Sequence, residues 1–307
     1  METQLAGFRR RRRVRRGVKL SLAALLAALL FTLPVLFPRS TGRQKSVPAT
    51  GVYLVDHNGR QIPLDTGTSP IDHTHLIDPS TLRYDLPESP AAPVIHTLVV
   101  PRGHTFALTL SDGTVIRVNS GSSLAYPAYF LPQRERSVEL IYGELFLEVA
   151  PDEHCPFLVR TPLSDTKVLG TRFNVQVRPG EHSNITLVQG SVAVKPAGAD
   201  WSSGIQLYPG ENAEVSPDRI SVQKVDVRNY TAWIDGYYYF DRKTVNEILE
   251  EICMVYDYRI GDPIPSQDPI RFWFDKDEDI HQVIVRLCKL AGVEVQLKGN
   301  VIVLKDN

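Results

Sequence analysis

Two groups of side chains in the sequence have types and spacings that could support chemistry. The Asp72-His73-Thr74-His75 stretch carries carboxylate and imidazole groups, which are common metal ligands. It lies in a proline-rich segment without an evident third ligand, so we interpret these histidines as solvated loop residues and expect no metal site. Glu144 and Glu148 are four residues apart on an expected strand, where they can face the same side as hydrolytic carboxylates would. No further group converges on that pair, so a hydrolase is not favoured.

The three cysteines and the familiar enzyme motifs give no stronger sign of catalysis. Cys253 and Cys288 fall on two expected helices, next to their apolar faces, while Cys155 has no evident partner. A disulfide between the first two and a pair of buried thiols are both open, with buried thiols preferred. The sequence contains no phosphate-binding loop, dinucleotide fingerprint, nucleophile elbow or zinc-binding helix. We therefore expect that the protein is not an enzyme and uses no cofactor.

Charge is distributed unevenly along the 307 residues. The formal net charge is −1, but residues 1–19 contain seven arginines and one lysine against a single glutamate. Residues 20–38 contain no charged side chain, and a helix of that length reaches about 28 Å, close to the ~30 Å hydrocarbon core of a bilayer. Basic residues stay on the cytoplasmic side of such spans. We expect a short basic cytoplasmic tip at 1–19, a transmembrane helix at 20–38 and an exported remainder.

A cleaved signal peptide has the same order of charge and is the alternative to a retained anchor. Its apolar region would be only about 7–15 residues long and would end at a small-residue cleavage site. Neither feature is evident around Phe37-Pro38-Arg39-Ser40, so the retained single-pass anchor is preferred. Because the arginine run adjoins this apolar segment, we interpret it as an orientation signal at the membrane and expect no nucleic-acid partner.

The exported part begins with a linker and an all-β region. Residues 39–93 are polar and rich in proline, and they contain an expected β-hairpin at 52–64 that turns at Asn58-Gly59. Residues 94–227 alternate apolar and polar side chains in short runs that end at turn residues, Tyr142-Gly143 among them. No stretch of this region sustains a helical period. The pattern predicts an all-β domain, either a sandwich, a barrel or a compact solenoid.

The pattern changes in residues 233–307. Residues 244–256 and 279–290 place apolar side chains on one face of a helix, and short strands flank both. The order strand–helix–strand occurs twice. This predicts a small α+β domain with both helices on one face of a sheet.

Short motifs in residues 95–227 follow the order and spacing of one known domain. They are Val100-Pro101-Arg102-Gly103, Leu110-Ser111-Asp112-Gly113-Thr114-Val115, Tyr142-Gly143-Glu144, Val168-Leu169-Gly170-Thr171-Arg172-Phe173-Asn174-Val175, Gln189-Gly190-Ser191-Val192 and Leu207-Tyr208-Pro209-Gly210-Glu211. With them the region resembles the FecR domain of bacterial transmembrane anti-sigma factors. Residues 233–307 are similar to the C-terminal domain of the same family, which is STN-like, that is, related to the short N-terminal domain of secretins and TonB-dependent receptors.

The resemblance implies a signalling function in the inner membrane of a Gram-negative bacterium, with a layout that suits the Bacteroidetes branch. Such regulators contact the signalling domain of a TonB-dependent outer-membrane receptor in the periplasm. They control an extracytoplasmic-function sigma factor in the cytoplasm. Their helical cytoplasmic segment is longer than the tip at 1–19, so the sigma-binding part is expected upstream, on another chain, or lost. The alternative function is a membrane-tethered periplasmic binding or scaffold protein without anti-sigma output.

Two aromatic residues of the C-terminal domain are the predicted contacts for a partner. An exposed sheet edge can accept a further strand from another protein, and side chains on the open face then give specificity. Tyr238 and Trp273 lie in aromatic runs of two expected strands, and we expect both to point away from their core-facing neighbours.

Gly170-Thr171 is the one position where the resemblance suggests covalent chemistry. In some members of the family this motif is a self-cleavage point. There the Thr171 hydroxyl would attack the Gly170 carbonyl, and water would split the resulting ester. The alternative is a tight turn or bulge where only glycine fits, and we prefer it.

Overall fold

The computed structural model describes most of the chain beyond residue 50. The described residues are 51–64, 74–78, 80–85, 94–132, 135–178, 182–266 and 268–305. The expected tip at 1–19, the expected transmembrane helix at 20–38 and the Asp72-His73 pair lie outside them. Within the described residues, none of the helices has both the length and the apolar character that a membrane span requires.

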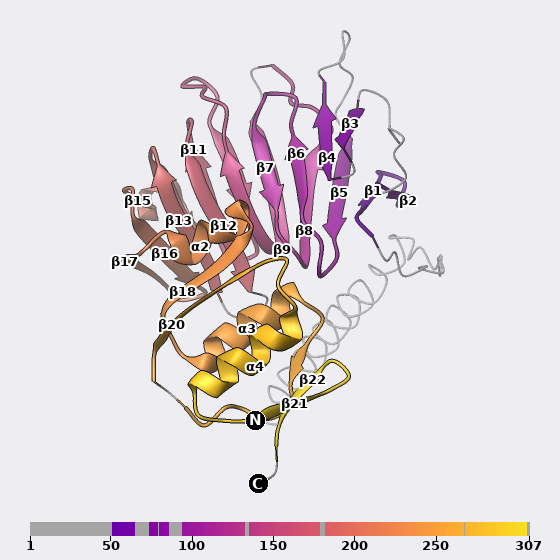
Figure 1. Cartoon of the computed structure of the whole chain (residues 1–307). Helices are drawn as coiled ribbons and strands as arrows, with labels where there is room; N and C mark the ends of the chain where they lie inside the picture. Colours follow the sequence, from indigo (N-terminus) through magenta and orange to yellow (C-terminus); the bar gives the residue numbers. More distant parts are fainter. Residues whose placement is uncertain are drawn as a thin grey trace, which may run out of the picture. The chain divides into compact units, whose positions relative to one another are not determined.

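Two β-sheets make up the larger part of these residues, which we call the β body (Figure 1). The first sheet has the order β2 (Gln61–Pro63), β1 (Tyr53–Val55), β5 (Ile95–Val100), β8 (Ser122–Pro127), β9 (Arg136–Glu148), β10 (Phe157–Arg160), β11 (Ser164–Val168), β14 (Val192–Pro196) and β15 (Ile205–Leu207). The second has the order β3 (Thr74–Asp78), β4 (Thr81–Tyr84), β6 (Phe106–Thr109), β7 (Val115–Val118), β9, β12 (Arg172–Arg178), β13 (His182–Gln189), β16 (Glu211–Ser216) and β17 (Arg219–Lys224). The expectation of a mostly β chain is confirmed.

Strand β9 belongs to both sheets and changes from one to the other at Gly143. Its first half pairs with β8 and β10, and its second half with β7 and β12. Gly143 has φ +99°, and a Cβ atom on it would lie 2.5 Å from Cα of Ser122. Only glycine is compatible with both conditions. The turn predicted at Tyr142-Gly143 is therefore wrong: the chain bends there but continues as one strand.

The core of the β body follows from the alternation of its strands. Inward-facing residues of both sheets join one buried hydrophobic cluster that includes Leu98, Ile116, Leu140 and Phe173. This is the packing expected when side chains alternate between a core and a solvent face.

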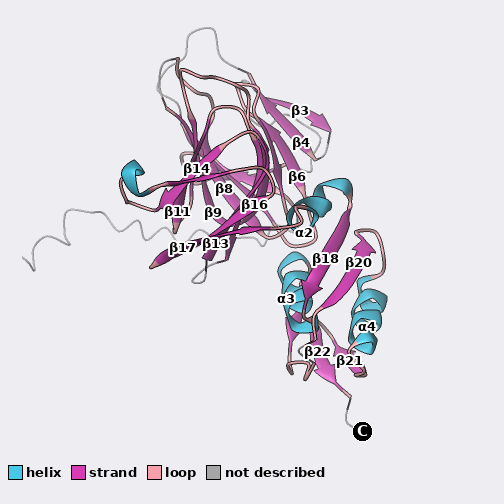
Figure 2. Ribbon diagram, turned by 90° about the vertical axis from the view of Figure 1, so that its left-hand side faces the viewer, coloured by secondary structure: helices cyan, strands magenta, loops and turns pink. Residues whose placement is uncertain are grey.

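The C-terminal module is a separate α+β arrangement built around its own buried cluster. Its elements are α2 (Arg228–Thr231), η3 (Ala232–Asp235), β18 (Tyr237–Lys243), α3 (Val245–Val255), β19 (Arg259–Ile260), β20 (Ile270–Asp275), α4 (Ile280–Leu290), β21 (Val295–Lys298) and β22 (Val301–Leu304); one further short helix, η2 (Trp201–Ser203), lies in the β body. Helix α3 begins with a capping box between Thr244 and Glu247. Figure 2 shows α3 and α4 beside the strands.

The strands of the module form two small sheets, where the sequence pattern predicted one. β18 pairs with β20, while β19 pairs with β22 and β22 with β21. Helix α3 packs against β18 of the first sheet and β19 of the second. The prediction of a single sheet is therefore wrong. The two helices share one apolar core, and both small sheets pack against it.

A buried ion pair fixes the start of β9. Arg136 is 5% exposed and donates hydrogen bonds to Asp112 Oδ2 and to the carbonyl oxygens of Ala150 and Cys155, each at 2.9 Å. Asp112 also accepts from the backbone and hydroxyl of Thr114, which closes the turn before β7. Asp112 thus joins a turn to the first residue of the strand that both sheets share.

Replacing Asp112 should strongly destabilise the β body. Asp112→Ala leaves the buried Arg136 guanidinium without its counter-charge, so we expect a loss of about 3–5 kcal/mol in the free energy of unfolding, measured by urea denaturation. Asp218→Ala removes an exposed carboxylate from the turn between β16 and β17 and should change that free energy by less than about 0.5 kcal/mol. Equal effects of the two substitutions would contradict this account.

Candidate functional site

The β body and the C-terminal module meet first at the end of helix α3. The carbonyl oxygen of Val255 accepts hydrogen bonds from the Ser120 hydroxyl at 2.5 Å and from the Gly103 amide at 2.9 Å. The last carbonyls of a helix have no partner within it, so the two body residues satisfy a group that would otherwise need water. Phe146 of β9 adds an apolar contact, because it is buried in the hydrophobic cluster of the module.

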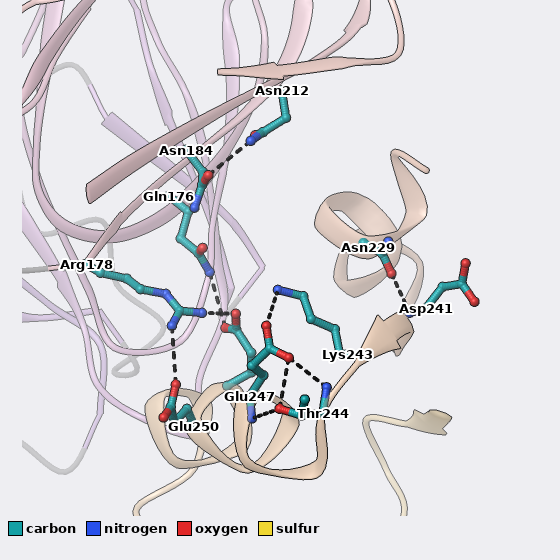
Figure 3. A network of polar contacts seen from close by, with 11 residues as sticks. Gln176, Arg178, Asn184, Asn212, Asn229, Asp241, Lys243, Thr244, Glu247 and Glu250 are labelled. Atoms are coloured by element: carbon teal, nitrogen blue, oxygen red, sulfur yellow. Dashed lines mark hydrogen bonds and ion pairs between the residues drawn. The ribbon is translucent and has the colours of Figure 1, made fainter. Parts of the chain in front are cut away.

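A second set of contacts between body and module is charged. Arg178, at the end of β12, donates a hydrogen bond to Glu251 of α3 and lies 3.9 Å from a carboxylate oxygen of Glu250. Gln176 donates to Glu251 at 3.3 Å. Figure 3 shows both β12 side chains directed toward the helix. The pair is only partly exposed, so its attraction is screened less than that of a surface ion pair.

Between these contacts lies a polar cavity of about 330 Å³. Residues of both parts line it, including Glu144 and Asn184 of the body and Tyr230, Trp233 and Tyr238 of the module. The Nε1 atom of Trp233 is buried and has no hydrogen-bond partner among the described residues.

Glu144 is a cavity residue whose electrostatic environment strongly shifts its pKa. It follows the bend at Gly143, and its two carboxylate oxygens accept from the side-chain amides of Asn119 at 2.7 Å and Asn174 at 2.8 Å. Burial, with the nearby Glu251 carboxylate as a second cause, raises the pKa of Glu144 from 4.5 to about 7. The two amide donors and Arg178 act in the opposite direction but do not cancel the effect.

Glu148, the other member of the predicted carboxylate pair, serves a different purpose. Its oxygens lie 3.5 Å from Arg117 and 3.4 Å from Arg172, which flank it on β7 and β12. It therefore takes part in cross-strand ion pairs, whereas Glu144 bonds to two asparagines. Among the described residues, no group of three or more His, Cys, Asp or Glu side chains could hold a metal ion.

Cys253 and Cys288 form no disulfide with each other in the structure. Cys288 is buried and Cys253 is half-buried. Burial raises the pKa of each thiol to about 11, so both are poor nucleophiles at neutral pH.

The outer face of the β18–β20 pair is aromatic and exposed. Trp273 is 57% exposed, while its neighbours Phe272 and Phe274 are buried, as the alternation of a strand predicts. Across the ladder Trp273 is paired with Tyr239, and Arg228 of α2 stacks 4.6 Å above the Tyr239 ring. We call Trp273, Tyr239 and Arg228 the aromatic face.

Tyr238, the other predicted contact, points the opposite way. It is only 9% exposed, and its ring stacks on Phe274 at a centroid distance of 5.1 Å within the core of the module. The prediction that Tyr238 points away from the core is therefore wrong: the inward register of β18 is Tyr238 and Phe240, which pair with Phe274 and Phe272.

Gly170 and Thr171 lie in a tightly packed loop before β12. A Cβ atom on Gly170 would lie 2.9 Å from Cα of Pro151, and one on Gly190 would lie 2.9 Å from Thr171 Oγ1. The Thr171 hydroxyl donates to the carbonyl oxygen of Ser191 at 2.9 Å, so its proton is engaged by that oxygen. Close packing thus gives a structural reason for both glycines.

Comparison with known proteins finds one family model and two solved structures that are similar to this chain. Residues 96–193 match the family model described as FecR protein. The chain is also similar to two crystal structures of a candidate anti-sigma factor from Parabacteroides distasonis ATCC 8503; each is 29% identical, aligns over 69% of this chain and 99% of its own, and has a TM-score of 0.60. No curated protein matches the chain. The predicted FecR resemblance is confirmed for residues 96–193.

The loop geometry predicts that the chain stays intact at Gly170-Thr171. Because the Thr171 hydroxyl is bonded to Ser191, freshly purified protein should give one species at the 34.4 kDa mass of the whole chain in a denaturing mass measurement. Thr171→Val, which has no nucleophile, is the matched control and should give the same single species. A fragment that ends at Gly170 in the unsubstituted protein alone would establish self-cleavage instead.

Proposed function

We propose that this protein is a FecR-type regulator of an extracytoplasmic-function sigma factor, and that it acts by protein–protein contacts and not as an enzyme. The match of residues 96–193 to the FecR model and the similarity to the candidate anti-sigma factor support this proposal. We further propose that residues 20–38 anchor the chain in the inner membrane, with residues 1–19 in the cytoplasm and the body and module in the periplasm. The charge order of the sequence supports that orientation.

The partner that we propose in the periplasm is the signalling domain of a TonB-dependent outer-membrane receptor. The aromatic face carries this proposal. An exposed tryptophan with a half-buried tyrosine and a stacked arginine beside it has the composition of an interface hot spot. Covering the 57% exposed Trp273 side chain would remove apolar surface from water, which favours binding of a partner at this place.

The backbone of β20 offers a means of attachment next to that face. Among the described strands, β18 and β20 pair only with each other, so each has one edge outside the ladder. At the β20 edge the carbonyl oxygen of Trp273 accepts a weak hydrogen bond from Arg286 at 3.3 Å, a contact that a partner strand could replace. Strand addition here would satisfy backbone groups and place Trp273 against the partner.

We assign the module an STN-like fold as part of the same proposal. Its strand–helix–strand order occurs twice, in β18-α3-β19 and β20-α4-β21, and this supports the assignment. A module of this kind would meet a related domain of the receptor, so that two similar folds bind through their strand edges.

Substituting Trp273 should abolish receptor binding without unfolding the module. Trp273→Asp places a charge in the centre of the aromatic face, and we expect the receptor recovered with the tagged protein to fall by at least about tenfold. The measurement is affinity capture from native membranes in mild detergent, followed by quantitative mass spectrometry. Val222→Asp, at a 43% exposed position on β17 of the body, is the matched control and should leave recovery unchanged.

The same capture tests both ends of the proposed relay. A receptor and a sigma factor that both co-elute with the unsubstituted protein would support the regulator. If the receptor co-elutes and no sigma factor does, the proposed anti-sigma function is wrong, and the protein would be a periplasmic binding protein. If Trp273→Asp captures as much receptor as the unsubstituted protein, the aromatic face is not the contact.

A further inference from the structure

Two carboxylates approach each other where the module meets the body. Glu144 comes from β9 of the body and Glu251 from α3 of the module, and both line the same cavity. The Glu251 charge acts on Glu144 there, where it disfavours ionisation of the second carboxylate. Arg178 is bonded to Glu251, whereas the hydrogen bonds that Glu144 accepts come from the neutral amides of Asn119 and Asn174. The Arg178 guanidinium is thus the positive charge that acts on both carboxylates, and it is bonded to Glu251.

We propose that Glu144 and Glu251 form a proton-dependent latch, in which the module is held firmly against the body while Glu144 is neutral and is held less firmly once Glu144 is ionised. The direction follows from Coulomb repulsion across a poorly solvated contact, where like charges weaken an interface. Three other contacts join the module to the body and would weaken when the module is held less firmly. They are the hydrogen bonds to Val255, the buried Phe146 ring and the ion pair of Arg178 with Glu251.

The groups that face Glu144 come from every element packed around it. The β7–β8 turn supplies Asn119, β12 supplies Asn174 and Arg178, and α3 supplies Glu251. β18 supplies Tyr238, whose pKa is raised mainly by burial and also by the charges of Glu144 and Glu251. The other charged residues that line the cavity are His182, Glu214, Arg228, Lys243, Glu247 and Glu250. Arg178, which also lines the cavity, lowers the pKa of Glu144 by its charge, and that effect is outweighed.

The pH window follows from the sign of the shift. In the closed contact the pKa of Glu144 is raised to about 7, chiefly by burial and then by the Glu251 charge. Opening removes the Glu251 charge and lowers that pKa, so the closed form binds more protons than an open one at pH values below about 7. The contact is therefore strongest at acidic pH and weakens as the pH rises toward about 7. This proposal does not rest on the proposed function, since it concerns only how the two parts of one chain are held.

The amide of Gly103 reports on the latch directly. Its N–H donates to Val255 across the contact at 2.9 Å and to the Ser120 hydroxyl oxygen within the body at 2.7 Å. Release of the module removes one of these two acceptors and should therefore speed hydrogen exchange there. The experiment compares exchange in the peptide containing Gly103 between the full chain in detergent micelles and its Glu144→Gln variant, at each pH from 5 to 8. The variant is permanently neutral, so the ratio of rates at one pH cancels the intrinsic pH dependence of exchange.

The expected ratio of wild-type to variant rates is smallest at pH 5, rises by up to about tenfold per pH unit, and levels off above about pH 7. Glu139→Gln changes an exposed carboxylate on the same strand and should give no pH-dependent ratio. A ratio that stays flat for Glu144→Gln would overturn the proposal.

A second variant keeps the test valid if Glu144→Gln does not fold. Glu251→Gln removes the repelling charge and leaves Arg178 to face Glu144 alone, so the midpoint of the pH response at Gly103 should move to lower pH. An unchanged midpoint in that variant would also overturn the latch.

Discussion

The bend of β9 at Gly143 is the constraint on which the rest of the structure depends. One strand can serve two sheets only if it turns between them, and Ser122 leaves no room for a side chain at that point. The Ser122 hydroxyl oxygen then accepts from the Glu144 amide at 2.9 Å and fixes the residue after the bend. The cavity-facing position of Glu144 is thus a direct result of how the two sheets are joined.

Local patterns predicted the elements well because each depends on neighbours in the sequence. Alternation gave the strands of the body, and the apolar face of 244–256 gave α3, whose capping box is also visible in the sequence as Thr244 with Glu247. The pattern failed where the outcome is set by distant residues. Tyr142-Gly143 has the composition of a turn, and only the approach of Ser122, some twenty residues earlier, makes it a bend within a strand.

Most of the candidate site could not be predicted from the sequence, because its contacts join residues that are distant in the sequence. Period-two spacing paired Glu144 with Glu148. In the structure Glu144 instead accepts hydrogen bonds from Asn119 and Asn174, and the Glu251 charge raises its pKa. Strand register also decides which aromatic residues are exposed. Trp273 and Tyr238 lie in similar aromatic runs, but Trp273 is exposed and Tyr238 is buried. In a run of three tyrosines, composition alone cannot say which of them faces the core.

Strand β18 connects the latch to the aromatic face through its alternation. Tyr238 lines the cavity beside Glu144, and the next residue, Tyr239, is the ladder partner of Trp273. If a partner bound at Trp273 shifts β18 relative to the body, it changes the surroundings of Glu144. By linkage, the proton at Glu144 then changes the affinity for that partner by the same factor. Binding at the aromatic face and protonation of Glu144 would therefore act on one contact between the body and the module.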